Sequence, residues 1–322
     1  MKATTAFQKL IWFFLGCCIV APFLSSCMTG GEVKAEEYYT IGMAYYELGK
    51  YEEAEQWLRR ARTADKTMTA SEYNLGKIAF ETERFGEAAL HFERVLKQDP
   101  DNVMALKSAA YSRIKNGDLE KAKALYERVL VLIPESSDDG FNYALVLYGM
   151  GKYEASEDVL NKYPFALEEN TPSMLLFARA QSAQNKIEAV NSYDKWAKAA
   201  SPASAQGLYE YAKLLEAEGF YARALEQYTA AQNAPATDTE KLKKSSLMFE
   251  EARLLLTADP ESTEGIAKLS ASVAAGFSDT AAIETLLQNE KLSAKNKEDA
   301  KKILDALLNS NQDSTAEAKT SD

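Results

Sequence analysis

Apolar residues along most of this chain recur at intervals of three and four, which predicts amphipathic helices, and the pattern returns with a fixed period of about 34 residues. Each repeat contains a small residue at a fixed position, in the series Gly42, Gly76, Ala110, Ala144, Ala178 and Ala212. A second series follows at a constant offset, at Ala54, Ala88, Ala122, Ser156, Val190 and Ala224. Two antiparallel helices approach closely only where side chains are small, and a large residue at such a crossing would cost about 1–3 kcal/mol. We therefore expect one pair of antiparallel helices in each repeat, crossing at these sites.

The segment between the two small sites of each repeat predicts a turn. It carries Gly49, Gly117, Gly151, Asn185 and Gly219, with Glu83 as the exception. Glycine and asparagine tolerate a positive φ and so end the first helix of the pair. Pro100, Pro134 and Pro202 then stop the second helix of their units before the next pair begins. The six helix pairs should start near residues 35, 69, 103, 137, 171 and 205.

This pattern resembles the tetratricopeptide repeat family over residues 35–238, as six units with the period of about 34 residues that is typical of that family. The third unit matches most clearly, whereas the fifth has Val190 and Asp194 where the family prefers alanine and an aromatic residue. The resemblance implies an all-α fold, an α-α superhelix of about six to seven helix pairs with capping helices at its C-terminal end. The alternative is a generic helical bundle, which requires no fixed repeat length.

Beyond residue 238 the repeat slips out of register. Helical patterns cover 241–256, 266–275, 281–287 and 297–308. We interpret residues 239–309 as one diverged helix pair followed by capping helices, because the end of a stack of repeats needs an outer face that is polar. Residues 310–322 are rich in serine, aspartate, threonine and alanine, which predicts a disordered tail.

The N-terminus has the features of a targeting segment. Lys2 and Lys9 precede an apolar run over residues 10–24, which is short for a membrane-spanning helix of about 20 residues but suits a signal peptide. The following Leu-Ser-Ser-Cys resembles a bacterial lipobox, which implies a lipoprotein signal peptide over residues 1–26, lipidation of Cys27 and a lipidated tether over residues 27–34. The alternative is an uncleaved membrane anchor. The lipid anchor implies attachment to the cell membrane or the outer membrane, facing the periplasm.

Composition and motifs argue against several kinds of chemistry. The formal net charge is −11, whereas a nucleic-acid-binding protein would need a basic face. The three cysteines all lie in the N-terminal segment that ends at Cys27, and the chain contains no Gly-rich phosphate loop or zinc signature. We expect the only histidine, His91, to be a solvated surface residue, and the acid pairs at 52–53, 168–169 and 250–251 to lie on solvated faces. We therefore expect no catalytic residue, no metal, no cofactor and no enzymatic activity.

The repeat family implies a binding groove lined by the first helix of each unit, with ligand contacts at positions 2, 5, 9, 12 and 13. Carried over by position, the aromatic members are Tyr39, Tyr46, Tyr73, Phe80, Tyr111, Phe141, Tyr148 and Tyr209. The basic members are Lys77, Lys107, Lys115, Arg179 and Lys213. These positions lie off the stripe of Ile41, Leu75 and their counterparts, which we expect in the core of the helix pairs. The alternative is that some of these rings pack one repeat against the next.

These features predict a protein that holds another protein or peptide in an aromatic groove. The lysines beside the rings indicate an acidic partner segment. We expect a lipid-anchored periplasmic scaffold or adaptor, and the alternative is a subunit of an envelope machine, such as an outer-membrane assembly lipoprotein or a transporter accessory. A third hypothesis, an enzyme in residues 239–309, lacks a candidate pair of nucleophile and base.

Overall fold

A computed structural model describes residues 34–164, 166–235 and 242–319 of the chain, and side chains as far as residue 309. The described residues form α-helices and connecting turns, and they contain no strand, which confirms the all-α prediction. They divide into two compact units, the first ending at Leu132 and the second beginning at Ile133. Within the described ranges, none of the helices combines the length and apolar character needed to cross a membrane. The predicted signal peptide and lipidation site at Cys27 lie outside the described residues.

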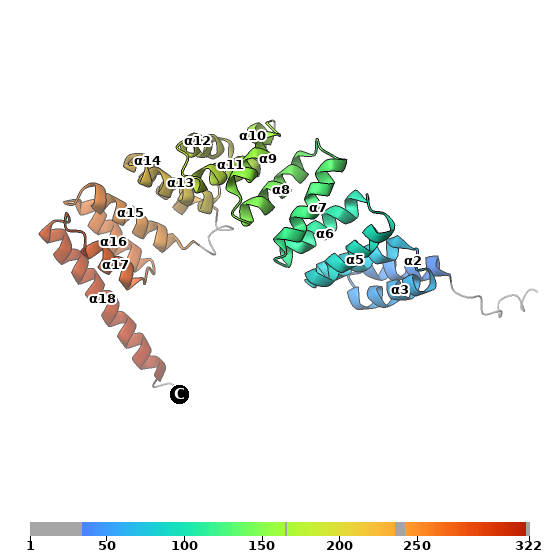
Figure 1. The fold of residues 1–322 in the computed structure, drawn as a ribbon. Coiled ribbons are helices and arrows are strands. Elements are labelled where there is room, and N and C mark those ends of the chain that lie inside the picture. Colours follow the sequence, from blue (N-terminus) through green and yellow to red (C-terminus); the bar gives the residue numbers. More distant parts are fainter. Residues whose placement is uncertain (1–33, 165, 236–241, 320–322) are drawn as a thin grey trace, which may run out of the picture. The chain divides into compact units, whose positions relative to one another are not determined.

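The first unit consists of three antiparallel helix pairs (Figure 1). Its helices are α2 (Ala35–Glu47), α3 (Tyr51–Ala64), α4 (Thr69–Glu81), α5 (Phe85–Gln98), α6 (Val103–Lys115) and α7 (Leu119–Leu132). The first helix of each pair begins at the residue where the repeat in the sequence places it. The start of α6 has a local cause, since the side chain of Asn102 accepts a hydrogen bond from the backbone N–H of Ala105 at 3.0 Å.

The second unit continues the pairs and ends in two further helices. Its elements are α8 (Ser137–Gly149), α9 (Tyr153–Asn161), α10 (Ala166–Glu169), α11 (Thr171–Ala183), α12 (Ala189–Ala199), α13 (Ala205–Ala217), α14 (Tyr221–Asn233), α15 (Lys244–Ala258), α16 (Thr263–Ala274), α17 (Thr280–Leu287) and α18 (Ala294–Lys319). Helix α9 is short, and Tyr163 follows it. The Tyr163 hydroxyl donates to the Pro134 carbonyl at 2.9 Å, and its ring lies so close to Gly140 that an added Cβ there would strike it.

The small residues are the crossing points of the pairs, as predicted. All of them are buried. A Cβ added at Gly42 would lie 2.9 Å from Leu58, and one added at Gly76 would lie 2.7 Å from Phe92. In the fourth pair the two small sites contact each other directly, because the Ser156 hydroxyl donates to the backbone carbonyl of Ala144 at 2.8 Å.

The turn within each of the six pairs contains one residue with positive φ. The glycines at these turns have φ between 70° and 80°, and Asn185 has φ 57°. Glu83, the exception in sequence, adopts the same conformation with φ 59°. The backbone geometry of the turn is therefore kept in the one repeat that lacks a residue suited to it.

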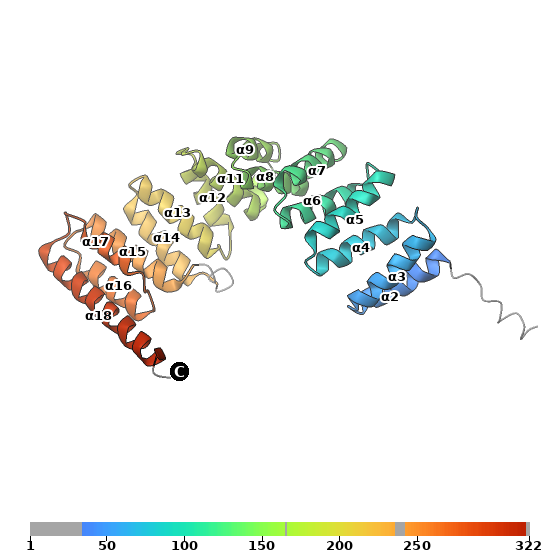
Figure 2. The same ribbon diagram turned by 60° about the horizontal axis from the view of Figure 1, so that its bottom comes forward.

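The C-terminal helices cover the end of the second unit. In Figure 2, α18 lies alongside α16 and α17, and the three helices share a core with α15 in which the rings of Phe249 and Phe277 stack 4.2 Å apart. The side-chain amide of Asn296 fastens α18 by donating to the carbonyls of Pro260 and Ser262. The helix extends to Lys319, through most of the segment for which we expected disorder. No proline or glycine interrupts the sequence after Gly276, so nothing in the covalent structure stops the helix there.

Three expectations about burial were wrong. His91 is 2% exposed and not solvated, because Glu72 from the neighbouring helix bonds its ring Nδ1 at 2.5 Å. Glu251 is 1% exposed, where Lys268 pairs with it at 2.6 Å and the Thr229 hydroxyl donates to it. Ile41 is 36% exposed and not in the core, since α2 has no preceding helix pair in the described part of the chain.

Candidate partner-binding face

Tyrosine side chains link neighbouring first helices of the first unit. The Tyr39 hydroxyl on α2 accepts a hydrogen bond from the Asn74 amide on α4 at 3.1 Å. One repeat further on, the Tyr73 hydroxyl on α4 lies 3.1 Å from the Ser108 hydroxyl on α6. Both rings are half-buried. These two predicted groove residues therefore hold successive repeats together, as the alternative interpretation required.

Around Tyr111 the same face has a small apolar hollow. The Phe80 ring packs against Phe85 at 5.2 Å and against Tyr111 at 5.3 Å, while the Tyr73 ring packs against the buried Phe92 at 5.1 Å. Tyr111 itself remains 45% exposed. A hollow of about 120 Å³ lies beside it, lined by Lys77, Phe80, Glu81, Phe92, Ser108 and Tyr111. Tyr111 is therefore the ring on this face that is both supported by its neighbours and open to a ligand.

Two of the three predicted cations of this face lie over tyrosine rings. The Lys77 ammonium is 4.6 Å from the centre of the Tyr46 ring, and the Lys115 ammonium is 5.6 Å from that of Tyr111. Neither lysine forms an ion pair with a carboxylate of the described residues. A cation over the face of an aromatic ring can still pair with a carboxylate of a ligand. Lys107 lies half-buried on α6 between them in sequence. The first unit thus combines an open ring with two cations that have no carboxylate partner among the described residues.

The corresponding face of the second unit is neutralised by its own acids. Arg179 on α11 donates to Glu210 on α13 at 2.6 Å, and Lys213 lies 3.7 Å from Glu216 and 3.9 Å from Glu250. Burial alone would lower the pKa of Arg179, but the hydrogen bond and charge of Glu210 outweigh it, and the pKa is raised. The predicted basic residues Arg179 and Lys213 are therefore already paired.

Two of the predicted rings of the second unit pack against other tyrosine rings. Tyr148 packs on Tyr153 at 5.1 Å, and Tyr209 packs on Tyr228 at 6.0 Å. Burial raises the pKa of both Tyr148 and Tyr209. Phe141 is half-buried at a hollow of about 270 Å³, whose other lining residues include Leu145, Leu175, Arg179 and Trp196.

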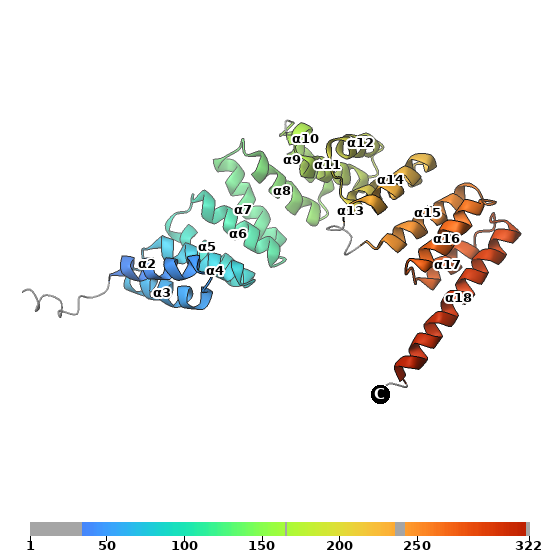
Figure 3. The same ribbon diagram turned by 180° about the vertical axis from the view of Figure 1, so that it is seen from behind.

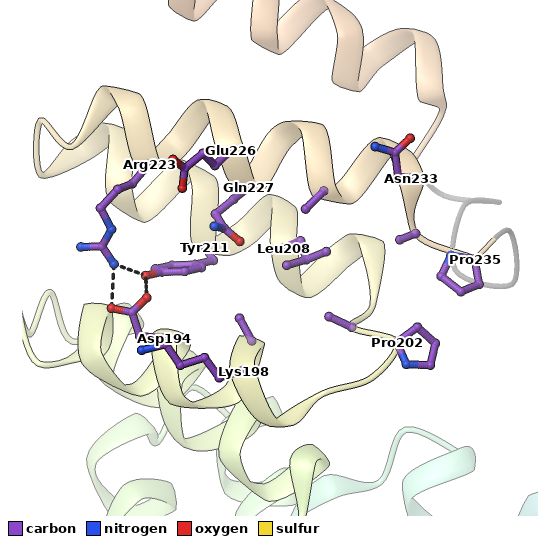
Figure 4. Close-up of a pocket in the computed structure, with 14 residues that line it drawn as sticks. Asp194, Lys198, Pro202, Leu208, Tyr211, Arg223, Glu226, Gln227, Asn233 and Pro235 are labelled. Atoms are coloured by element: carbon purple, nitrogen blue, oxygen red, sulfur yellow. Dashed lines mark hydrogen bonds and ion pairs between the residues drawn. The ribbon is translucent and has the colours of Figure 1, made fainter.

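A larger hollow between α12, α13 and α14 was missed by the sequence reasoning (Figure 4). Its volume is about 570 Å³, and at one end Arg223, Asp194 and Tyr211 form a closed network. The Arg223 guanidinium contacts Asp194 at 2.6 Å and donates to the Tyr211 hydroxyl, which in turn donates to Asp194. Burial and the Asp194 carboxylate raise the pKa of Tyr211. Asp194 stands where the repeat family prefers an aromatic residue, and that departure was the signal in the sequence.

The described residues offer no arrangement suited to a metal. No group of three or more histidine, cysteine, aspartate or glutamate side chains in this part of the chain could hold a metal ion. The buried cluster at His91 consists of a histidine, acids and arginines that pair with one another. Arg62 lies 3.1 Å from Glu72, and Arg94 lies 3.1 Å from the His91 ring.

Comparisons with known proteins agree with this architecture. Tetratricopeptide repeat models match residues 35–67 and 73–140. Tetratricopeptide repeat protein 1 of Schizosaccharomyces pombe is 26% identical over 123 residues, which are 38% of this chain but only 12% of that protein. An uncharacterized lipoprotein of Treponema pallidum is 24% identical over 135 residues, covering 42% of this chain and 69% of the relative.

A solved structure extends the likeness beyond the matched repeats. The crystal structure of a tetratricopeptide repeat protein from Parabacteroides merdae superposes with a TM-score of 0.56 at 19% identity, over 78% of this chain and 97% of that one. At this identity the likeness concerns the fold alone. The chain therefore contains tetratricopeptide repeats, over residues 35–67 and 73–140, and its helix pairs have the tetratricopeptide repeat fold.

Proposed function

We propose that this chain is a lipid-anchored periplasmic scaffold that binds a protein or peptide on the face formed by α2, α4 and α6. One observation carries the proposal. Tyr111 is 45% exposed beside a hollow, and Lys77 and Lys115 lie on the same face without carboxylate partners among the described residues. Aromatic side chains supported by their neighbours are typical anchors of binding energy, and nearby cations favour acidic partners.

The chemistry of this face indicates what the partner offers. The hollow of about 120 Å³ has room for one apolar side chain. An acidic residue on either side of that side chain would approach Lys77 and Lys115. We therefore expect an acidic segment with one apolar or aromatic side chain at its centre, bound as an extended peptide or along one face of a helix. The role is to hold another protein and not to catalyse a reaction.

The anchor of this scaffold is assigned to Cys27. The lipobox-like sequence before it supports the assignment, and so does the likeness to a bacterial lipoprotein, of which 69% is covered by the match. Two or more acyl chains suffice for stable attachment to a membrane. The tether after Cys27 would then keep the binding face close to the membrane surface on the periplasmic side.

Binding to variants of the face tests the proposal. Partners are captured from detergent extracts of membranes, identified by mass spectrometry, purified and titrated against the wild-type chain. We expect Tyr111→Ala to weaken binding about tenfold or more, which corresponds to about 1.4 kcal/mol. The double reversal Lys77→Glu with Lys115→Glu should weaken binding further and reduce its dependence on salt.

A matched control uses lysines elsewhere on the first unit. Lys66 and Lys97 are exposed and lie outside the first helices, so Lys66→Glu with Lys97→Glu changes the net charge equally. Equal binding by the two double variants, with helicity unchanged by circular dichroism, would contradict the proposal. A stable complex of fixed stoichiometry that resists both reversals would instead favour the subunit of an envelope machine.

A further inference from the structure

The outer face of the first helix pair is apolar, and no other helix of the described residues covers it. In the second, third and sixth pairs, the second helix of the preceding pair contacts the first helix, and the residue before the small site is buried there, so Leu75 is 2% exposed and Ala109 and Tyr211 are fully buried. The first pair, α2 and α3, is the outermost of its unit (Figure 3), and no helix in the described part of the chain precedes it. Its equivalent residue Ile41 is 36% exposed, and Leu48, seven residues further along at the C-terminal cap of α2, is 70% exposed.

Aromatic rings and cations extend this surface. The Tyr38 ring packs against Trp57 at 5.8 Å, and the Arg60 guanidinium lies 4.5 Å from the centre of the Trp57 ring. The Lys50 ammonium lies 5.9 Å from the Tyr45 ring. We call this surface the terminal face and define it by Tyr38, Ile41, Tyr45, Leu48, Lys50, Trp57 and Arg60. A terminal repeat normally has a polar outer side, so an apolar one indicates that something covers it.

We propose that the terminal face lies against the lipid headgroups of the membrane to which the chain is anchored. This inference rests on the proposed anchor. Only the short segment 28–34 separates Cys27 from the start of α2. A fully extended chain covers at most about 3.5 Å per residue, so this segment reaches no more than about 25 Å. That distance is less than the thickness of a bilayer. An uncleaved anchor over residues 10–24 would leave only the segment 25–34 before α2. With either a lipidated Cys27 or an uncleaved anchor, the terminal face is therefore held close to the membrane surface.

The composition of the terminal face fits a headgroup region. Tyrosine and tryptophan are enriched where membrane meets water, because one end of each side chain is apolar and the other polar. Lysine and arginine extend their charged ends toward phosphate while their stems cover apolar surface. The cations are offset by nearby exposed acids, namely Glu36, Glu37, Glu47, Glu52 and Glu53. We therefore expect contact with neutral as well as anionic lipids, strengthened by the high effective concentration that the tether provides.

Tryptophan fluorescence tests this contact directly. Of the three tryptophans, Trp12 precedes Cys27, Trp196 is 2% exposed, and Trp57 lies on the terminal face. The chain from residue 27 onward has Cys27 as its sole cysteine, so it can be coupled to a maleimide lipid in phosphatidylcholine vesicles. With Trp196→Phe isolating Trp57, we expect bromine-labelled acyl chains to quench Trp57 emission and to shift its maximum to shorter wavelength. The Trp57→Phe variant, which retains Trp196, should show no quenching.

Substitutions on the face complete the test. Ile41→Glu with Leu48→Glu should abolish the quenching of Trp57 while coupling to the vesicle is retained. Unquenched Trp57 in the protein without these changes would overturn the proposal. So would association into dimers that depends on Leu48, because a second copy would then cover the face. Acyl chains on native Cys27 are measured separately by intact mass. Their absence would refute the lipid anchor of the proposed function, whereas unquenched Trp57 with acylation present would refute only the membrane contact.

Discussion

Glu83 is the turn residue whose replacement by glycine should make this protein more stable. It adopts φ 59°, in the left-handed region that the other repeats reserve for glycine or asparagine. Its side chain is exposed and makes no hydrogen bond or ion pair in the described part of the chain. The turn is held by the backbone, since Glu83 N–H donates to the Phe80 carbonyl and Arg84 N–H to the Ala79 carbonyl. Glu83→Gly therefore changes the backbone energy alone.

The size of the effect follows from two opposing contributions. An L-residue in the left-handed region costs roughly 1–2 kcal/mol, which glycine does not incur. Glycine loses more conformational freedom on folding, at a cost of roughly 0.5–1 kcal/mol. The difference favours glycine by up to about 1.5 kcal/mol, with a midpoint of about 0.75 kcal/mol. For a unit of this size, residues 34–132, each kilocalorie corresponds to a rise in melting temperature of about 4–8 °C.

Gly117 provides the matched reverse experiment. It has φ 80° at the equivalent turn of the next repeat, and an added Cβ there would meet no atom within 4 Å. Gly117→Glu should therefore destabilise through backbone strain alone, by a similar amount. Calorimetry of the chain from residue 28 onward measures both changes, and amide hydrogen exchange locates them to α4–α5 and α6–α7. A neutral Gly117→Glu, or a Glu83→Gly variant that melts lower, would show that the turn is not strained.

Two further predictions concern the packing between helices of the first unit. Gly76→Leu should lower the midpoint of urea denaturation, because the new side chain meets the buried Phe92. The resulting overpacking costs about 1–3 kcal/mol, which exceeds the gain in helix propensity. An unchanged midpoint would contradict the close crossing of the two helices at Gly76. Glu72→Gln should destabilise by about 1–3 kcal/mol at pH 7. Burial alone would raise the pKa of Glu72, but bonds from His91 and Arg62 hold it below its ordinary value of 4.5, so the loss should shrink as the pH falls below that value. A difference between the two proteins that is independent of pH from 3 to 7 would argue against an ionised Glu72.

The repeat could be predicted from sequence because its constraints are local. Gly42 and Gly76 mark places where a Cβ would strike the partner helix, at Leu58 and Phe92, and the separation along the chain is the same in both pairs. The regular period of the small residues therefore fixes both where a helix starts and which of its sides is buried. Residue type alone does not identify every turn, because Glu83 adopts the same positive φ as the glycines and Asn185 at the other turns.

Burial of polar residues could not be predicted in the same way. His91 was expected in solvent because no cysteine lies near it in sequence, and Glu251 because its acid pair lacks a deeply apolar setting. Their partners Glu72 and Lys268 lie 19 and 17 residues away, on other helices. The apolar stripe of a helix indicates which side of that helix faces the core. It does not identify the polar residue on the neighbouring helix that a buried histidine or glutamate will pair with. Such contacts become visible only when neighbouring helices are placed.

The binding face presents the same difficulty, and the structure suggests how sequence could have resolved it. The ninth position of a repeat holds a cation in three units, Lys77, Arg179 and Lys213, yet only Lys77 lacks a carboxylate partner among the described residues. The twelfth position differs between these repeats. It is aromatic at Tyr46 and Phe80, and it is acidic at Glu216 and Glu250. A lysine over an aromatic ring has no carboxylate partner within the described part of the protein, whereas one between two glutamates is already paired. Reading the ninth and twelfth positions together, across adjacent repeats, would have identified Lys213 as paired, whereas the partner of Arg179, Glu210, lies at the sixth position of the next repeat.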